Sequence, residues 1–83
     1  MIFKDMEKEG MKRLIECQKG CRARVVKLYA KGDLKQRLIS FGIMKGVVVD
    51  VLEHSVGKST IEIKIGKMRI ALRDKEAQEI EVE

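Results

Sequence analysis

Five side chains in this sequence carry the donor atoms that transition metals prefer. Cys17 and Cys21 could supply thiolates, which bind soft or borderline divalent ions, and His54 could add an imidazole. Asp50, Glu53 and His54 form a second set, because carboxylates and imidazole suit ferrous iron. A structural zinc site takes four ligands, however, and neighbouring strand residues point to opposite faces. We therefore expect outward solubility charges and inert, buried thiols, with Fe2+ or another divalent transition metal as the alternative.

The spacing of the two cysteines bears on the same question. If residues 17–21 are extended, Cys17 and Cys21 share one face but lie about 13 Å apart, too far to hold one ion. Gly57-Lys58-Ser59-Thr60 resembles the end of a phosphate-binding loop, but Leu52 stands where the required earlier glycine would be, and alternating isoleucines follow instead of a helix. We interpret it as a hairpin loop. With one histidine and no supported nucleophile–base pair, the sequence predicts no enzyme and no required cofactor.

Length and composition limit the class of protein. A chain of 83 residues makes one small domain, and its 45% apolar content excludes wholesale disorder. Residues 1–16 are broken by charges and no apolar run approaches the ~20 residues of a membrane span. We therefore expect no membrane insertion and no export. With only two cysteines, a reduced, cytoplasmic location is expected.

The net charge of +5 is unevenly distributed along the chain. Residues 1–42 hold eleven Lys/Arg against five Asp/Glu, a net of +6, while residues 43–83 hold seven against eight, a net of −1. Such asymmetry is compatible with an acidic protein partner, anionic lipid or nucleic acid, and an ordinary soluble surface explains it equally well. A nucleic-acid-binding barrel is the less favoured alternative, because only three aromatic residues are available for base stacking.

Apolar periodicity predicts an all-β domain with short helices. Strands are expected over residues 22–29, 47–52, 61–65, 68–73 and 80–82, with Gly66-Lys67 as a two-residue hairpin turn and one helical turn over 75–78 capped by Asp74. Leu34, Leu38 and Phe41 form one stripe of a helix over 33–41. Asp33 is expected to cap this helix and Gly42 to end it. About five strands around one short helix predict a small SH3-like barrel, with residues 1–12 as an extension and 13–83 as the domain.

The predicted helix and the loop before it also supply candidate partner contacts. Lys31, Lys35 and Arg37 would form one positive field, and Phe41 would form a docking edge with Tyr29. Aromatic and arginine side chains often dominate interface energetics. Because Arg37 is expected to point away from the core, the sequence predicts that Arg37→Glu leaves the fold intact.

These residues also carry a resemblance. Arg37-Leu38, Gly42-Ile43 and Gly46, followed by the ungapped pattern over residues 70–82, resemble the ferrous iron transport protein A (FeoA) family, and the similarity covers residues 14–83. It departs from the family in lacking prolines in the loop over residues 55–60.

The resemblance implies an SH3-like barrel and a non-enzymatic accessory role in the cytosol. Its implied partner is FeoB, the membrane ferrous-iron transporter with a cytosolic GTP-binding domain. An Fe2+-binding or sensing module is the first alternative function, and no nucleic-acid partner is expected. Exposed barrel edges allow a homo-oligomer.

Overall fold

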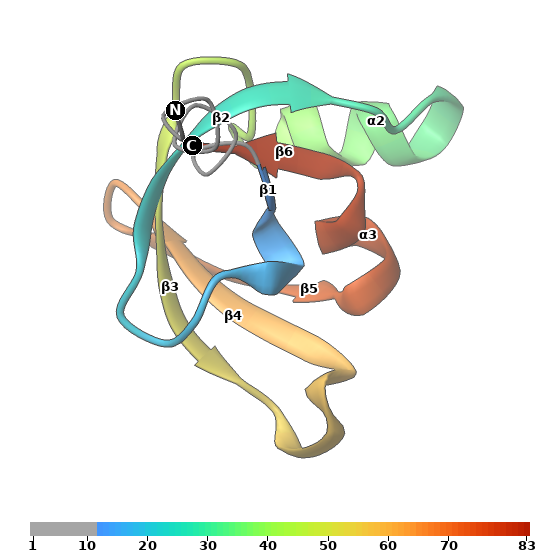
Figure 1. The fold of residues 1–83 in the computed structure, drawn as a ribbon. Helices are drawn as coiled ribbons and strands as arrows, with labels where there is room; N and C mark the ends of the chain where they lie inside the picture. The colour runs from blue at the N-terminus through green and yellow to red at the C-terminus, as the bar shows by residue number, and fades with distance from the viewer. Residues whose placement is uncertain (1–11) are drawn as a thin grey trace, which may run out of the picture.

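The structure, a computed structural model, describes residues 12–83, so the predicted extension over residues 1–12 lies outside the described residues except for Lys12. In this part of the chain, six antiparallel strands form a curled sheet in the order β1-β6-β2-β3-β4-β5 (Figure 1). The strands are β1 (Lys12–Arg13), β2 (Arg22–Leu28), β3 (Val48–His54), β4 (Thr60–Ile65), β5 (Met68–Arg73) and β6 (Ile80–Val82). The helical elements are η1 (Leu14–Glu16), α2 (Gly32–Ser40), η2 (Val56–Lys58) and α3 (Asp74–Gln78).

One face of each long strand fills the barrel interior. Ile61 and Ile63 of β4 have no exposed surface. Val51 of β3, which pairs with Ile63, is 1% exposed, and Val49 of the same strand is 0% exposed. Burying each such side chain contributes about 1.5–3 kcal/mol, so this alternation is the main term that holds the sheet closed. Met68 breaks the predicted alternation of β5, because it directly follows the hairpin turn and remains 48% exposed.

The predicted number of strands is one too low. The additional strand is β1, whose Lys12 and Arg13 pair with Val82 and Glu81 of β6. Two residues are too few to show an apolar alternation, so periodicity could not reveal this strand. The remaining strands and the helix after the first long strand lie where they were predicted, to within two residues.

Helix α2 differs from its prediction at the start and agrees at the end. It begins at Gly32 after Lys31, and no side chain caps it, so the capping role predicted for Asp33 is wrong. At the other end, Gly42 adopts a φ of +92°. The Gly42 N–H donates to the Ile39 carbonyl (2.8 Å) and the Ile43 N–H donates to the Leu38 carbonyl (3.0 Å). This is the glycine-dependent Schellman ending that the sequence predicted.

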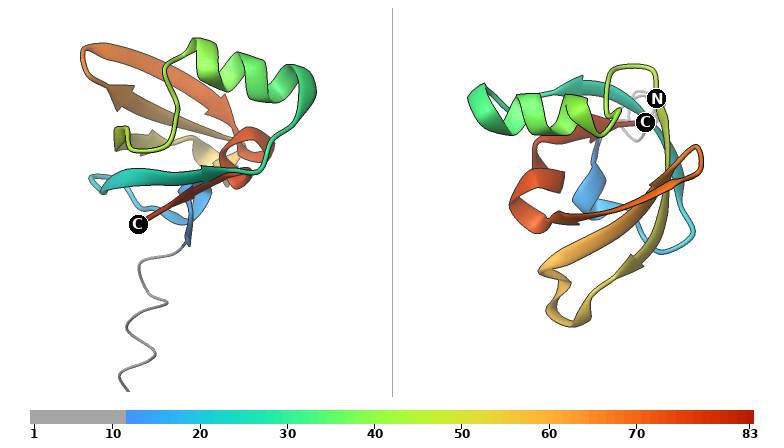
Figure 2. Two further views of the ribbon diagram at one scale, coloured as in Figure 1. Left: turned by 90° about the horizontal axis from the view of Figure 1, so that it is seen from above. Right: turned by 180° about the vertical axis from the view of Figure 1, so that it is seen from behind.

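The second helix, α3, is short and closes one side of the barrel. It begins at Asp74, one residue earlier than predicted, and Arg73 occupies the cap position assigned to that aspartate. The Arg73 backbone N–H donates to Glu76 Oε1 at 2.9 Å. Figure 2 shows α2 and α3 on the same side of the molecule, with α2 beside the end of β2 and α3 between β5 and β6. Within residues 12–83, no helix has the length and apolar content needed to cross a membrane.

Candidate functional site

The outward face of β2 presents exposed basic side chains beside half-buried apolar ones. Arg22 and Arg24 are exposed, and Val26 and Leu28 are half-buried. Ala23 and Val25, which lie between them, are buried in the core. Side chains of a strand alternate between faces, so Arg22, Arg24 and Val26 lie on the outward side of the sheet. Leu28 lies beyond an irregularity in the strand, where it pairs with the buried Ile80 and packs against the core. Two hollows flank this surface.

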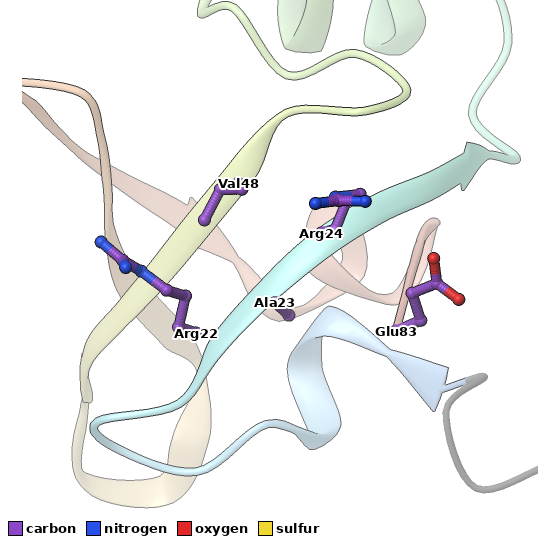
Figure 3. A pocket seen from close by; sticks show the side chains of 5 residues that line it. All are labelled: Arg22, Ala23, Arg24, Val48 and Glu83. Atoms are coloured by element: carbon purple, nitrogen blue, oxygen red, sulfur yellow. The ribbon is translucent and has the colours of Figure 1, made fainter.

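The first hollow, here called the arginine hollow, has a volume of about 280 Å³. It is lined by Arg22, Ala23, Arg24, Val48 and Glu83 (Figure 3). The Arg22 guanidinium Nε lies 2.9 Å from Asp50 Oδ1 on β3, so one of the two arginines is already neutralised by a carboxylate. The backbones of Arg24 and Glu83 exchange hydrogen bonds of 3.1 and 3.0 Å, which fix the wall of this hollow.

The second hollow, here called the lysine groove, is larger, at about 430 Å³. It lies between β2, α2 and the loop that leads into β3. Its apolar lining consists of Val26, Leu28, Ile39 and Met44, and its basic lining consists of Lys27, Lys35 and Lys45. Met44 is 46% exposed, so the apolar lining is open to solvent.

An irregularity in β2 shapes the lysine groove. Val25 pairs with Val82 and Lys27 pairs with Glu81, so two steps along β2 match one step along β6. Val26 is therefore the extra residue of a β-bulge, a feature that bends a strand and re-aims its side chains. The bulge directs apolar side chains of β2 toward α2, where Ile39 completes the apolar lining.

The groove lysines form no ion pair with the described residues, although Lys27 lies opposite Glu81 in the pairing of β2 with β6. The ion pairs within residues 12–83 involve the basic residues Lys19, Arg22, Arg37 and Arg69, none of which lines the groove. Lys27 lies over the Tyr29 ring at 4.8 Å, a contact that leaves its positive charge unneutralised. The groove therefore presents three positive charges around an apolar lining.

Of the five predicted partner residues, only Lys35 lines the groove. Lys31 is exposed at the start of α2 and lines neither hollow. Phe41 is half-buried against the core, with the Arg37 guanidinium 5.6 Å from its ring centre. The structure thus separates this set instead of gathering it into one patch.

Arg37 belongs to a contact between the two helices. Its Nε lies 3.5 Å from Glu76 Oε2, and the Glu76 side chain is only 10% exposed. The other Glu76 oxygen accepts the Arg73 backbone N–H. Arg37 therefore points out of the core, with its side chain 56% exposed, and also compensates a nearly buried carboxylate, a contact that the sequence did not predict.

Tyr29 is also engaged within the barrel. Its hydroxyl donates to Glu81 Oε1 at 2.6 Å, and the Arg13 guanidinium lies 4.2 Å from its ring centre. The hydrogen bond to Glu81 raises the pKa of Tyr29, because the neutral phenol donates to the carboxylate. The Arg13 guanidinium also donates to the Gln78 carbonyl at 2.8 Å, so Tyr29 helps join β1, β6 and the end of α3.

The two cysteines lie closer together than an extended segment would allow. A 3-10 turn over Leu14–Glu16 precedes the cysteines, and a turn closed by the Cys21 N–H to Gln18 carbonyl bond (3.0 Å) breaks the extended path between them. Burial, and then the neighbouring Cys21 thiol, raise the pKa of Cys17 to about 12. The supposition of an extended segment is wrong, and Cys17 is a buried, protonated thiol.

The remaining metal candidates are not gathered around the thiols. His54 uses Nε2 to donate to the Cys17 carbonyl at 2.6 Å. Asp50 pairs with Arg22, and Glu53 lies 3.6 Å from the Lys19 ammonium. Among the residues that the structure describes, no three Cys, His, Asp or Glu side chains converge on a point that could hold a metal ion. The loop after β3 contains η2, with a φ of +83° at Gly57, and leads directly into β4, as a hairpin loop does.

Sequence reasoning missed most of the lysine groove. Its signal was present as apolar residues on the outward face of a strand and as Ile39, four residues after Lys35 on one helix face. The bulge at Val26, which brings the apolar residues of β2 toward α2, has no distinct sequence pattern, because valine is also common in regular strands.

The chain is similar to known proteins in its domain family, in its sequence and in its fold. Residues 12–83 match the FeoA domain family. A Campylobacter jejuni protein named Fe(2+) transport protein A is 36% identical over 69 residues, which are 83% of this chain and 93% of that protein. A Helicobacter pylori protein of the same name is 47% identical over 45 residues, 54% of this chain, and the match spans only 59% of that protein.

A solved structure agrees in fold. Stenotrophomonas maltophilia FeoA, solved as a complex with zinc and described as an SH3 domain protein, superposes with a TM-score of 0.75 and 28% identity over 86% of this chain and 88% of that one. The predicted SH3-like barrel is confirmed. On the match over residues 12–83 and the identity to the Campylobacter protein, the chain belongs to the FeoA family.

Proposed function

We propose that this chain is a non-enzymatic accessory component of ferrous-iron transport, and that it acts in the cytoplasm by docking onto the cytosolic part of the FeoB-type GTP-binding transporter. The observation that carries the proposal is the match of residues 12–83 to the FeoA domain family. Relatives in that family are named for Fe(2+) transport.

The surface of the described residues supports a docking role. Binding a protein partner requires exposed apolar atoms with charges that can choose the orientation, and the lysine groove offers both. The net charge of +6 on residues 1–42 would accelerate encounter with an acidic partner.

The proposal is tested by measuring association between the full chain and the purified cytosolic domain of the transporter. We expect binding at low salt that weakens as salt rises, because the Debye length shrinks from about 30 Å at 0.01 M to about 8 Å at 0.15 M. Radiolabelled ferrous-iron uptake in cells that lack the chain, with and without its restoration, measures the consequence for transport. Absence of association even at low salt would refute docking on this domain.

A metal-responsive module is the second candidate, since the Stenotrophomonas relative is described as complexed with zinc. The residues described here do not fit a metal site well. The raised pKa of Cys17 opposes the thiolate form that binds metals, and Asp50 is held by Arg22. Anaerobic titration with Fe2+ and Zn2+ distinguishes the two proposals: near-stoichiometric binding that Cys17→Ala or His54→Ala abolishes would favour the metal-responsive role.

A further inference from the structure

The lysine groove combines two properties that suit a binding role. Its apolar lining is open, with Met44 exposed at 46%, and its lysines form none of the ion pairs found within residues 12–83. The arginine hollow differs on both counts, because it is smaller and Asp50 already neutralises Arg22. Of the two, the lysine groove is the one whose charge is left for a partner to satisfy.

We propose that the lysine groove binds an acidic segment of a partner protein, whose aliphatic side chains enter between β2 and α2 while flanking Asp and Glu side chains pair with Lys27, Lys35 and Lys45. The inference rests on the proposed function for the identity of that partner. The chemistry of the segment follows from the groove alone.

The apolar lining argues for aliphatic side chains as the groups that enter. Val26, Leu28, Ile39 and Met44 surround a volume of about 430 Å³, which lies within the range of about 300–1,000 Å³ typical of small binding pockets. Methionine adapts its shape to what it contacts, and Met44 is the most exposed member of the lining. Removing this apolar surface from water provides the favourable free energy of binding.

The basic lining argues for carboxylates beside those aliphatic groups. Lys27 lies on β2, Lys35 on α2 and Lys45 in the loop that precedes β3, so the positive charges come from separate elements around the groove. A segment with acidic residues on both sides of an aliphatic one would place opposite charges near these lysines. Such pairs set orientation and encounter rate more than affinity.

Other occupants fit the groove less well. Nucleic acid binding without aromatic stacking would rely on phosphate contacts alone, and the groove lining contains no aromatic residue. A flat membrane surface gains little from apolar atoms that lie in a hollow, because those atoms do not reach the acyl chains. A second copy of this chain that packed groove against groove would bring its own lysines toward these lysines, at an electrostatic cost.

The test uses the full chain, with two substitutions in the groove and a matched control for each. Met44→Asp places a carboxylate in the apolar lining, and its control is Met68→Asp at the β4–β5 turn, where the methionine is similarly exposed at 48%. Lys45→Glu reverses a groove charge, and its control is Lys75→Glu on α3, which lines neither hollow. Circular dichroism and thermal unfolding check that all four variants fold.

Two probes are titrated by fluorescence anisotropy. One is the cytosolic domain of the transporter. The other is a short peptide in which Leu and Ile are flanked by Asp and Glu, compared with a version in which Ser replaces each Leu and Ile. We expect Met44→Asp to weaken binding of the acidic aliphatic peptide about tenfold or more, and Lys45→Glu to weaken it several-fold with a flatter salt dependence. The two control variants should bind like the unmodified chain.

The outcomes separate this inference from the proposed function. If the transporter domain binds the groove variants as well as the unmodified chain, the groove assignment is overturned and docking stands. If the peptide binds through the groove and the transporter domain does not bind at all, the groove assignment stands and the proposed partner is wrong. Equal binding of the serine version would overturn the aliphatic requirement, and with it the inference.

Two further measurements address the competing occupants. Sedimentation equilibrium of the chain alone would overturn the inference if it showed a dimer that Met44→Asp abolishes, since a second copy would then cover the groove. Co-sedimentation with phosphatidylglycerol vesicles would overturn it if the same two groove variants, and neither control, lost vesicle binding while peptide binding was absent.

Discussion

Two regions of this small barrel treat charged side chains in opposite ways. Where α2 meets α3, Arg37 lies 3.5 Å from the nearly buried Glu76, whose second oxygen accepts a backbone N–H. On the groove side of the same helix, Lys35 lies over an open apolar lining and has no carboxylate partner among residues 12–83. Arg37 and Lys35, which are two positions apart on α2, therefore have different roles. Arg37 has a structural role, and Lys35 is available for binding.

The difference shows that exposure alone does not identify a docking residue. Arg37 retains a side-chain exposure of 56%, yet its charge compensates a carboxylate that would otherwise lie nearly buried without a counter-charge. The helix-contact region should respond to substitution by losing stability, and the groove region by losing binding with stability unchanged.

The largest effect is expected in the helix-contact region, at Leu38. This side chain has no exposed surface and anchors α2 to the core, so Leu38→Ala should lower the free energy of unfolding by about 2–5 kcal/mol. Urea denaturation followed by circular dichroism measures the change. A loss below about 0.5 kcal/mol, the range of surface substitutions, would mean that α2 does not hold the helix-contact region together.

Charge reversal at Arg37 should have the next largest effect. Arg37→Glu brings a second carboxylate beside Glu76, and we expect a loss of about 1–3 kcal/mol, below the range for a fully buried ion pair because Arg37 is partly exposed to solvent. Chemical denaturation of Arg37→Glu and of the double variant Arg37→Glu/Glu76→Gln is the measurement. The second substitution should restore part of the lost stability, and no restoration would exclude the ion pair as the cause.

The buried Cys17 thiol, which follows η1, should make the stability of the fold depend on pH. Cys17 has its pKa raised from 9.0 to about 12, so the folded chain holds this proton more tightly than the unfolded chain does. Its contribution to stability is present below about pH 9 and declines as pH rises toward 12. Between these values, the unfolding free energy of the unmodified chain should fall more steeply with pH than that of Cys17→Ala. Identical slopes would show that the thiol proton is not retained on folding.

The smallest effect on stability is expected in the groove. Lys45→Glu should change the free energy of unfolding by no more than about 0.5 kcal/mol, because the lysine is exposed and has no ion-pair partner among the described residues. Thermal and urea unfolding provide the check, with Lys75→Glu as the comparison. A loss as large as that of Arg37→Glu would remove the distinction between the two regions.

The sequence predicted those features that depend on neighbours in the chain. Alternation at Ile61 and Ile63 predicted a half-buried strand, and Gly42 predicted the end of α2, because both signals act within a few residues. The start of α2 was misplaced because Asp33 satisfies a local capping pattern, while the backbone instead begins the helix at Gly32.

Features that depend on distant residues escaped prediction. Glu76, the partner of Arg37, lies in another helix, and the partner of Tyr29 is Glu81 in β6, so neither contact could be read from local spacing. The shape of the lysine groove depends on how β2 is aligned with β6, and the bulge at Val26 sets that alignment. The sequence of β2 alone does not contain this information. Of the candidate site, the sequence therefore supplied Lys35 and the overall positive charge but not the apolar lining.

The position of β6 has a consequence for how this barrel forms. Strand β6 lies between β1 and β2, so Lys12 must find Val82 and Leu28 must find Ile80 before that part of the sheet is paired. Contacts between residues so far apart in sequence raise the relative contact order, which slows folding. During synthesis, the ribosome must release residues 80–82 before β1 and β2 gain their shared neighbour, while the β3–β4–β5 meander can assemble earlier. Ribosome-stalled chains that end before β6 should therefore expose the edge of β2 to chaperones.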